Sequence, residues 1–491
     1  MTTVPLDEPA GSSAGTDLGA ATEVLDEPDE AVGARPAGPG GESGASDRPP
    51  GRLRDLGVHP IRRWEAGGHR FLPGISFPIA VWAVWRAIQL AVSVYLGEQS
   101  WTLSERAVRV AMNYDGERYL AILHQGYANH TVVMPNTAFF PLTSWIAAPV
   151  WWLTRSDEWT VHIVASLTAI AAFVCIWGVT TCWRDERIAR RAVLLFAIFP
   201  SSLFLWAFYS EALFIALGAG AVWADHKGRR GLAAALFVAL ATTRSVGILI
   251  PAVLVACRVI RNGPPLREVL RRLPGQLGAV VIGASLVAFC LVPKFSLLLP
   301  AAAVFGLFAV LGRRLDRWCA IYLGAAAIGF TAVLLVMWKQ TGDPFAWAKV
   351  QGDWGRDISQ PWRAIQQGFD NLYPKPDTVM VPALVARNLD LWSVPIIAFP
   401  LLYAAFSRRD RFPMETWMIG VALIALPLFS SVLASFNRFV MADWVIYPVY
   451  ASALARIPGR WRWMPYVALT IAAAFVAYAM IGRFSVDRFV G

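Results

Sequence analysis

Charged residues are scarce in this 491-residue chain, because Asp, Glu, Lys and Arg make up only 16% of it, whereas 56% of the residues are hydrophobic. A soluble protein of this length could not enclose so much apolar surface in its cores. The scarcity of charge therefore excludes the soluble classes and predicts an all-α polytopic membrane protein. The net charge of +10 comes from short clusters between apolar runs, a pattern typical of cytoplasmic loops that predicts no nucleic-acid partner.

Several catalytic signatures are also missing. The chain has no Walker, GxGxxG, HExxH or GxSxG motif, and its six histidines lack metal-ligand spacing. Its five cysteines lie in or beside apolar runs and form no CxxC pair, which favours buried thiols over disulfides or metal ligands. These absences leave ATP-driven, hydride-transfer and metal-hydrolase chemistry without support. No cofactor is predicted with certainty, and only a divalent cation of unknown identity is left open.

The N-terminal 70 residues differ from the rest of the chain. Residues 1–48 are rich in Gly, Ala, Pro and acidic residues, and they lack the periodic apolar positions that would order them. A basic juxtamembrane flank follows and precedes the first apolar run near Ile75. We therefore expect residues 1–70 to form a disordered cytoplasmic tail, and residues 71–491 to form the membrane domain.

Apolar runs and basic clusters together predict the topology of that domain. Thirteen spans are expected, several of them short: 75–97, 159–183, 192–208, 211–224, 232–243, 247–258, 276–292, 295–311, 318–338, 389–406, 414–434, 440–456 and 463–481. With a cytoplasmic N-terminus, this count places all six Arg/Lys clusters between the spans on the cytoplasmic side. It requires 139–154, with its tryptophans, to lie in the outer interface rather than to cross.

The same topology sends the polar stretches of the chain to one side of the membrane. The first of them, 113–141, carries Asp115 beside Gly116 and is expected to be a flexible loop within the extracytoplasmic segment 98–158. The segment 339–388 is the second long loop on that side. Glu211, Arg244 and Arg438 are expected to open there too, which indicates an active site facing away from the cytoplasm of a plasma-membrane protein.

Sugar transfer from a polyprenyl phosphate suits these residues. The phosphate leaving group needs only positive charge to hold it, which Arg244 and Arg438 could supply, because an arginine at a membrane edge marks an ion pair or an anionic ligand. The acceptor hydroxyl needs one base, for which Asp115 is the candidate. Aromatic side chains could stack on sugar rings.

Short motifs occur in this order: Tyr114-Asp115-Gly116-x-x-Tyr119, Gly126-Tyr127, Phe139-Phe140-Pro141-Leu142, Phe199-Pro200-Ser201, Tyr209-Ser210-Glu211, Thr243-Arg244-Ser245-x-Gly247, Gly342-Asp343-Pro344-Phe345, Gln351-x-x-Trp354-Gly355 and Arg438-Phe439. As an ordered set, from about residue 75 to 456, they resemble the PIG-V-type mannosyltransferases, which add the second mannose in GPI-anchor synthesis, and their bacterial relatives. The family usually has Trp at position 114 and Tyr at position 439, so both departures keep an aromatic ring.

The resemblance implies a GT-C glycosyltransferase fold and a polyprenyl-phosphate-mannose donor. It also implies inversion at the anomeric carbon, with Asp115 as the general base. An acidic leader and an Ala/Arg-rich composition favour a bacterial member, whose acceptor would be a lipoglycan, another glycolipid, a glycan or a protein rather than a GPI precursor. Residues expected to contact the substrates are Tyr114, Tyr119, Tyr209, Glu211, Asp343 and Trp354.

Each of these positions also has a structural interpretation. Asp115-Gly116 could form only a turn, and Glu211 could cap a helix. Arg244 and Arg438 could each pair with a carboxylate, Glu211 or Asp443 being candidates. Asp343 before Pro344 is a natural turn former, and Trp354 could anchor the membrane interface.

Other functions are compatible with parts of the pattern. A transferase of the same fold could use a polyprenyl-linked arabinofuranose or glucose. A flippase for lipid-linked sugars would share the spans and arginines but would need no base, and a membrane scaffold would leave the converging polar stretches without a purpose.

Overall fold

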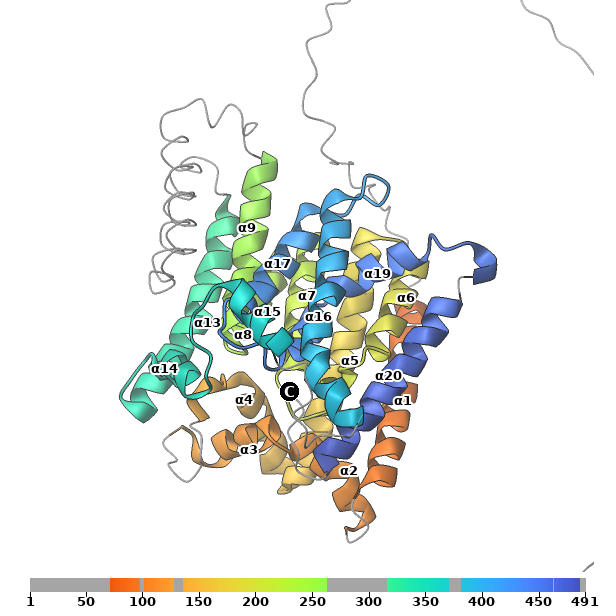
Figure 1. Ribbon diagram of the computed structural model, residues 1–491. Helices are drawn as coiled ribbons and strands as arrows, with labels where there is room; N and C mark the ends of the chain where they lie inside the picture. The colour runs from red at the N-terminus through yellow and green to blue at the C-terminus, as the bar shows by residue number, and fades with distance from the viewer. Residues whose placement is uncertain are drawn as a thin grey trace, which may run out of the picture. The chain divides into compact units, whose positions relative to one another are not determined.

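The computed structural model describes residues 71–97, 101–127, 136–262, 316–370, 381–461 and 463–485. The expected tail and the expected spans 276–292 and 295–311 lie outside these residues. Within them the secondary structure is helical, apart from one isolated antiparallel bridge between Ile358 and Ser430 (Figure 1).

The described residues form the following α-helices. They are α1 (Phe71–Leu96), α2 (Leu103–Met112), α3 (Asp115–Gln125), α4 (Leu142–Thr154), α5 (Asp157–Trp183), α6 (Glu186–Ala197), α7 (Glu211–His226), α8 (Arg230–Ala241), α9 (Leu249–Asn262), α13 (Arg317–Thr341), α14 (Ala346–Asp353), α15 (Pro361–Asp370), α16 (Val381–Phe406), α17 (Met414–Leu428), α18 (Phe436–Ala442), α19 (Ile446–Leu454) and α20 (Met464–Ser485). Short 3₁₀ turns occur at Asn136–Ala138, Ser202–Leu205, Ser245–Ile248 and Gly459–Trp461.

Local sequence explains where many of these helices begin. Ser156, Asp185 and Asp316 each precede a helix, and their side chains accept a hydrogen bond from the backbone N–H three residues on. Thr102 and Glu105 form a reciprocal capping box at α2. Such caps satisfy backbone donors that have no partner inside the helix, and so fix its first turn.

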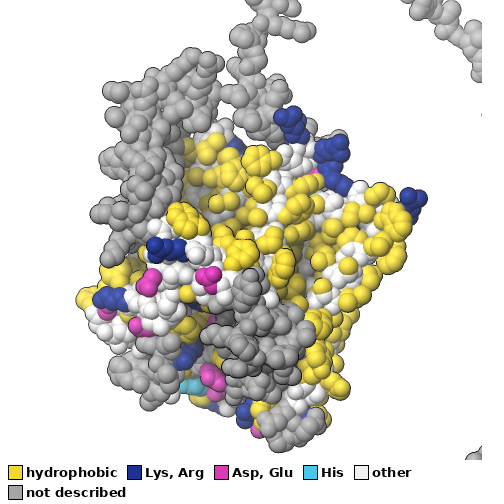
Figure 2. Space-filling model, in the orientation of Figure 1, with side chains coloured by type: hydrophobic (Ala, Val, Ile, Leu, Met, Phe, Trp, Pro, Cys, Tyr) yellow, Lys and Arg dark blue, Asp and Glu magenta, His cyan; other side chains and the backbone are white. Residues whose placement is uncertain are grey.

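Five helical segments are long and apolar enough to cross a membrane: Gly74–Leu96, Asp157–Trp183, Ser245–Asn262, Arg317–Thr341 and Asn388–Phe406. They confirm the expectation of a multi-pass membrane protein. Figure 2 shows hydrophobic side chains covering the sides of the helices, with Lys and Arg gathered at the upper edge of this face. Several other expected spans, such as α6, α7 and α8, are shorter helices, and two lie outside the described residues. The count of thirteen and the orientation of the termini therefore stay predictions.

Three expected spans end earlier or are divided. The span 192–208 stops as a helix at Ala197, because proline at position 200 cannot donate a backbone hydrogen bond. The span 440–456 divides at Asp443, whose φ of −79° and ψ of 80° leave the helical region. The span 414–434 ends at Leu428, after which the chain pairs with residues 357–359.

The helices pack closely through small residues. Helix α5 contacts α7, α6, α1 and α4, and Gly329 lets α13 approach α8 so closely that a Cβ would lie 2.2 Å from the Val238 carbonyl oxygen. Small residues allow such contact between membrane helices, where packing rather than the hydrophobic effect drives association.

The expectation of a flexible loop at 113–141 is wrong for its first part. Asp115 opens helix α3, and the 3₁₀ turn Asn136–Ala138 and the 13-residue helix α4 follow, with α4 packed on α3 and α5. The carboxylate thus projects from a helix start, where the helix dipole favours negative charge. Tyr114, before it, has a φ of 57°, a strained conformation for a residue with a side chain.

Candidate active site

Two acidic and two basic side chains meet near the beginnings of four elements. Asp115 begins α3, Glu211 begins α7, Arg244 precedes the 3₁₀ turn before α9, and Arg438 lies on the short helix α18. The ion pairs among them show that these distant polar stretches converge, as their expected placement on one side of the membrane requires.

Glu211 lies at the centre of this cluster. Its Oε1 accepts hydrogen bonds from Arg438 Nε (3.1 Å) and Nη2 (2.6 Å), and it lies 2.7 Å from Arg244 Nη1. Its Oε2 is buried and has no hydrogen-bond partner among the described residues. The Glu211 side chain is 0% exposed. Arg244 and Arg438 both pair with it, as their structural interpretation from the sequence allowed.

Asp115 completes the cluster and differs from Glu211 in access. Its Oδ2 lies 2.6 Å from Arg438 Nη2, yet the side chain keeps 12% of its surface exposed. Its backbone N–H donates to the Tyr209 hydroxyl (3.3 Å), which donates to the carbonyl of Asn113 (3.3 Å). Tyr209 therefore fixes the start of α3, and Asp115 is the more exposed carboxylate of the pair.

Arg438 is held by aromatic rings as well as by charge. Its guanidinium carbon lies 4.8 Å from the ring centre of Phe204 and 4.7 Å from that of Tyr209. Arginine stacks on such rings while its planar fork still binds oxygens. This environment leaves the guanidinium in one orientation, toward the two carboxylates.

Asp390, on α16, fixes the turn that carries Arg438. Its carboxylate accepts hydrogen bonds from the backbone N–H of Ser435 (3.1 Å) and from the backbone and side-chain amides of Asn437 (2.8 and 2.6 Å). Ser435 has a φ of 63°, and Ser201 donates to the Asn437 side chain at 2.8 Å. The Phe199-Pro200-Ser201 motif thus supports the arginine from a distant part of the chain.

Tyr119 and Tyr114 flank the cluster on either side of Asp115. The Tyr119 hydroxyl hydrogen-bonds to the side chain of Ser210, and burial, followed by the charge of Glu211, raises the pKa of Tyr119. Its hydroxyl therefore stays protonated at neutral pH. Tyr114 is half-buried and packs against the main core.

The two predicted residues from the second loop lie apart from the charges. Trp354 packs edge-on against Phe139 (6.1 Å between ring centres), which packs against Tyr119 (5.4 Å). Asp343 instead pairs with Lys349 (2.5 Å) and accepts a hydrogen bond from the Phe345 backbone (2.9 Å). These local bonds agree with the interpretation of Asp343 as a turn former. Trp354 instead packs with Phe139, which packs with Tyr119, and these three rings form an aromatic wall.

Sequence reasoning missed Arg356 and Asp390. Arg356 directly follows the Gln351-x-x-Trp354-Gly355 motif, which was an available signal, and its guanidinium lies 5.8 Å from the ring centre of Phe439. Asp390 is an acidic residue inside an apolar run, a position that by itself marks a buried partner.

The cluster is poorly suited to a metal ion, because both carboxylates already pair with arginine. In the part of the chain that the structure describes, no group of three or more His, Cys, Asp or Glu side chains could hold one. The sequence left a divalent cation open without predicting one, and this arrangement does not test that question.

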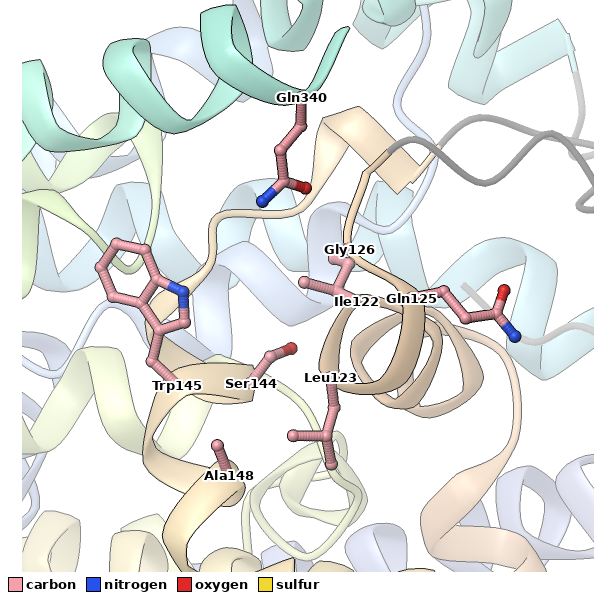
Figure 3. Close-up of a pocket in the computed structure, with 8 residues that line it drawn as sticks. All are labelled: Ile122, Leu123, Gln125, Gly126, Ser144, Trp145, Ala148 and Gln340. Atoms are coloured by element: carbon pink, nitrogen blue, oxygen red, sulfur yellow. The ribbon is translucent and has the colours of Figure 1, made fainter.

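A cavity of about 400 Å³ lies elsewhere, between α3, α4 and the last turn of α13. Figure 3 shows Ile122 and Leu123 facing Ser144, Trp145 and Ala148 across it. It adjoins the end of α3, whereas Asp115 begins that helix, and no charged side chain lines it. The cavity is therefore distinct from the carboxylate–arginine cluster.

Long apolar helices that carry a buried carboxylate–arginine cluster at their ends define a multi-pass membrane protein with an enzyme-like site. Residues 102–295 match the family described as mannosyltransferase (PIG-V). The resemblance inferred from the motifs is thereby confirmed over these residues, and the match supports a glycosyltransferase activity for the protein. The match includes Asp115, Glu211 and Arg244 and ends before Arg356 and Arg438.

Solved structures with similar helices include an archaeal oligosaccharyltransferase, AglB from Archaeoglobus fulgidus, in complex with an inhibitory peptide and a dolichol-phosphate. It is 13% identical, with a TM-score of 0.41 over 83% of this chain and 56% of that chain. The apo oligosaccharyltransferase of the same organism is 14% identical, with a TM-score of 0.43 over 87% and 57%. This chain spans little more than half of their length. No curated protein matches the sequence.

Proposed function

We propose that the protein transfers mannose from polyprenyl-phosphate-mannose to an extracytoplasmic glycolipid, lipoglycan or glycan, with inversion and with Asp115 as general base. One observation carries this proposal. Of the two carboxylates in the cluster, Asp115 keeps part of its side chain exposed while Glu211 is fully buried. An acceptor hydroxyl can therefore reach one carboxylate, which is what a single-displacement transfer needs.

The arginines suit the departure of the polyprenyl phosphate leaving group. A polyprenyl phosphate leaves without protonation, so positive charge near it lowers the barrier. Arg244 and Arg438 are held in place by Glu211, which keeps their guanidinium groups oriented before the donor binds. In this proposal Glu211 organises the arginines, and the aromatic wall of Tyr119, Phe139 and Trp354 contacts sugar.

Apolar side chains surround Arg244. Phe214, Val246, Leu423, Phe439 and Ala442 line with it a void of about 10 Å³, which has room for no more than a water molecule in this conformation. A guanidinium next to apolar walls matches a phosphate joined to an isoprenoid, which is amphipathic in the same way. The GT-C fold and the mannose specificity are parts of this proposal that come from the family resemblance.

Transfer with defined donors tests the function. Purified protein should move labelled mannose from polyprenyl-phosphate-mannose to a lipid or glycan acceptor in a membrane extract, giving a product with the opposite anomeric configuration. Matched donors carrying arabinofuranose or glucose should react far more slowly. Retention of configuration would overturn the single-displacement mechanism, and absence of transfer from all three donors would favour a flippase.

The side of the membrane has its own test. Asp353 is exposed at the end of α14, and Gly231 is exposed with open space around it at the start of α8. In intact cells an impermeant thiol reagent should label Asp353→Cys and leave Gly231→Cys unlabelled until the cells are opened. The reverse pattern would place the cluster on the cytoplasmic side.

A further inference from the structure

Arg356 lies in the segment between α14 and α15, and the preceding motif determines its position. The backbone carbonyl of Gln351 accepts hydrogen bonds from Trp354 (3.2 Å) and Arg356 (2.9 Å). Gly355 between them has a φ of 64°, which favours glycine because a side chain there is strained. The chain therefore turns tightly at Gly355 while Trp354 stays packed against Phe139.

A second set of bonds ties this segment to the chain just before α18. Ser431 donates from its side chain to the Gly355 carbonyl (2.8 Å) and from its backbone to the Asp357 carbonyl (2.8 Å). The backbone of Ser359 donates to Phe429 (2.8 Å), and Ile358 pairs with Ser430. Arg356 is thus anchored on both sides to the segment that leads into Arg438.

The guanidinium of Arg356 lies near the cluster and shares the ring of Phe439 with Arg244. It lies 5.8 Å from the centre of that ring, and Arg244 lies 5.2 Å from the same centre. Burial, and then the charge of Arg438, lower the pKa of Arg356, while Asp115 acts in the opposite direction. The side chain is half-buried, so it projects toward the site rather than into bulk solvent.

Charges in the cluster do not balance once Arg356 is included. Asp115 and Glu211 offset Arg438 and Arg244, with which they form ion pairs. The Arg356 guanidinium forms no ion pair and no hydrogen bond with a residue that the structure describes, and its contact there is the ring of Phe439. A half-buried arginine held in one place without a carboxylate is poised for an anionic ligand.

We propose that Arg356 binds the phosphate of the polyprenyl-phosphate donor beside the ring of Phe439, which Arg244 also contacts. The proposal rests on the function proposed above and assigns the direct phosphate contact to the arginine that pairs with no carboxylate of the described residues. Arg244 and Arg438 then contribute positive charge nearby. The guanidinium fork can bind two phosphate oxygens, which the ammonium group of lysine cannot do with the same geometry.

Binding of a short prenyl phosphate by full-length protein in detergent tests this assignment apart from catalysis. Arg356→Ala should weaken binding of farnesyl phosphate by about ten- to a hundredfold, the loss expected for a charge-assisted hydrogen bond. Arg356→Lys should fall between it and the wild type. Because Arg356 pairs with no carboxylate of the described residues, its removal leaves none of those unpaired, and both variants should elute as folded, monodisperse protein.

Two control experiments test whether Arg356 recognises the phosphate group of the ligand. Farnesol, the uncharged counterpart, should bind wild type and Arg356→Ala equally, because it lacks the phosphate. The matched control is Arg363→Ala, which removes an exposed arginine from α15 and should leave farnesyl phosphate binding unchanged. If inorganic phosphate displaced farnesyl phosphate at equal concentration, the site would be one for free anions and the donor assignment would fail.

Transfer assays separate this inference from the proposed function. If wild type transfers mannose, Arg356→Ala should raise the donor KM in proportion to the loss in binding, and an unchanged KM together with unchanged farnesyl phosphate binding would overturn the assignment. If wild type transfers no mannose but Arg356→Ala still weakens farnesyl phosphate binding, the phosphate site stands and the mannosyl function fails.

Discussion

Helix α7 has an arginine–carboxylate network at each end, and the two networks differ. At its last turn Asp225 pairs with Arg258 of α9 and accepts a hydrogen bond from Tyr322 of α13 (2.5 Å). Nearby, Arg261 pairs with Glu415 of α17. Each arginine there has its own carboxylate, and the pairs tie four helices together.

At the first turn of α7, about 20 Å away by helix rise, the pairing is uneven. Arg244 and Arg438 share one oxygen of Glu211. Among the described residues, the other oxygen of Glu211 has no hydrogen-bond partner and Arg356 pairs with no carboxylate. Arginine–carboxylate pairs alone therefore do not mark an active site. The excess positive charge, together with the exposed part of Asp115, separates the candidate active site from a network that joins helices.

The largest expected effect follows from removing the base. Asp115→Asn keeps an oxygen that can accept from Arg438 but cannot take a proton, so transfer should fall by roughly 10²–10⁴-fold. Initial rates with labelled polyprenyl-phosphate-mannose measure this, and binding of the donor should persist. Asp353→Asn, at an exposed position on α14, is the control and should keep wild-type rates. If the Asp115→Asn variant kept wild-type activity, another residue would have to be the general base.

Removing Arg438 should damage folding more than removing Arg244. Arg438→Ala leaves Asp115 unpaired and Glu211 with one arginine, whereas Arg244→Ala leaves both carboxylates bound to Arg438. Breaking a buried pair costs about 3–5 kcal/mol of the free energy of unfolding. Thermal stability in detergent should follow that order, and Glu211→Gln should partly restore folded yield to Arg438→Ala. Equal stability of the two alanine variants would contradict the shared-oxygen arrangement.

Breaking the network at the other end of α7 should affect stability without changing substrate affinity. Asp225→Asn weakens the pair with Arg258 and should lower the free energy of unfolding by about 1–3 kcal/mol, because hydrogen bonds to charged groups are worth that much. The folded fraction should keep the wild-type donor KM. A raised KM in that fraction would show that the two ends are coupled and would weaken the contrast between them.

The smallest effect is expected at Asp343. Its partners Lys349 and the Phe345 backbone are local and solvent-facing, and exposed pairs contribute little. Hydrogen bonding to Lys349 lowers the pKa of Asp343, so the carboxylate is charged at neutral pH in the wild type. Asp343→Ala should change the donor KM and thermal stability only slightly. A KM increase of tenfold or more would restore the substrate contact predicted from the sequence.

The sequence by itself determined the class of the protein and most helix positions. Apolar runs predicted α5 at 159–183 and α13 at 318–338, and the structure has Asp157–Trp183 and Arg317–Thr341. It also marked Asp115, Glu211, Arg244 and Arg438 as polar residues at the ends of such runs. These features are local, because hydrophobic length, caps and turn residues act within a few positions of the chain.

How those residues pair, and how much of each side chain is exposed, depends on the tertiary structure. Arg438 and Asp115 are 323 residues apart in the chain, and Arg438 and Glu211 are 227 apart. No local pattern encodes that both arginines share one oxygen of Glu211, that Asp115 keeps an exposed face, or that Arg356 pairs with no carboxylate in the part of the chain that the structure describes. Burial and charge balance depend on which helix ends pack together, so they follow from the fold as a whole.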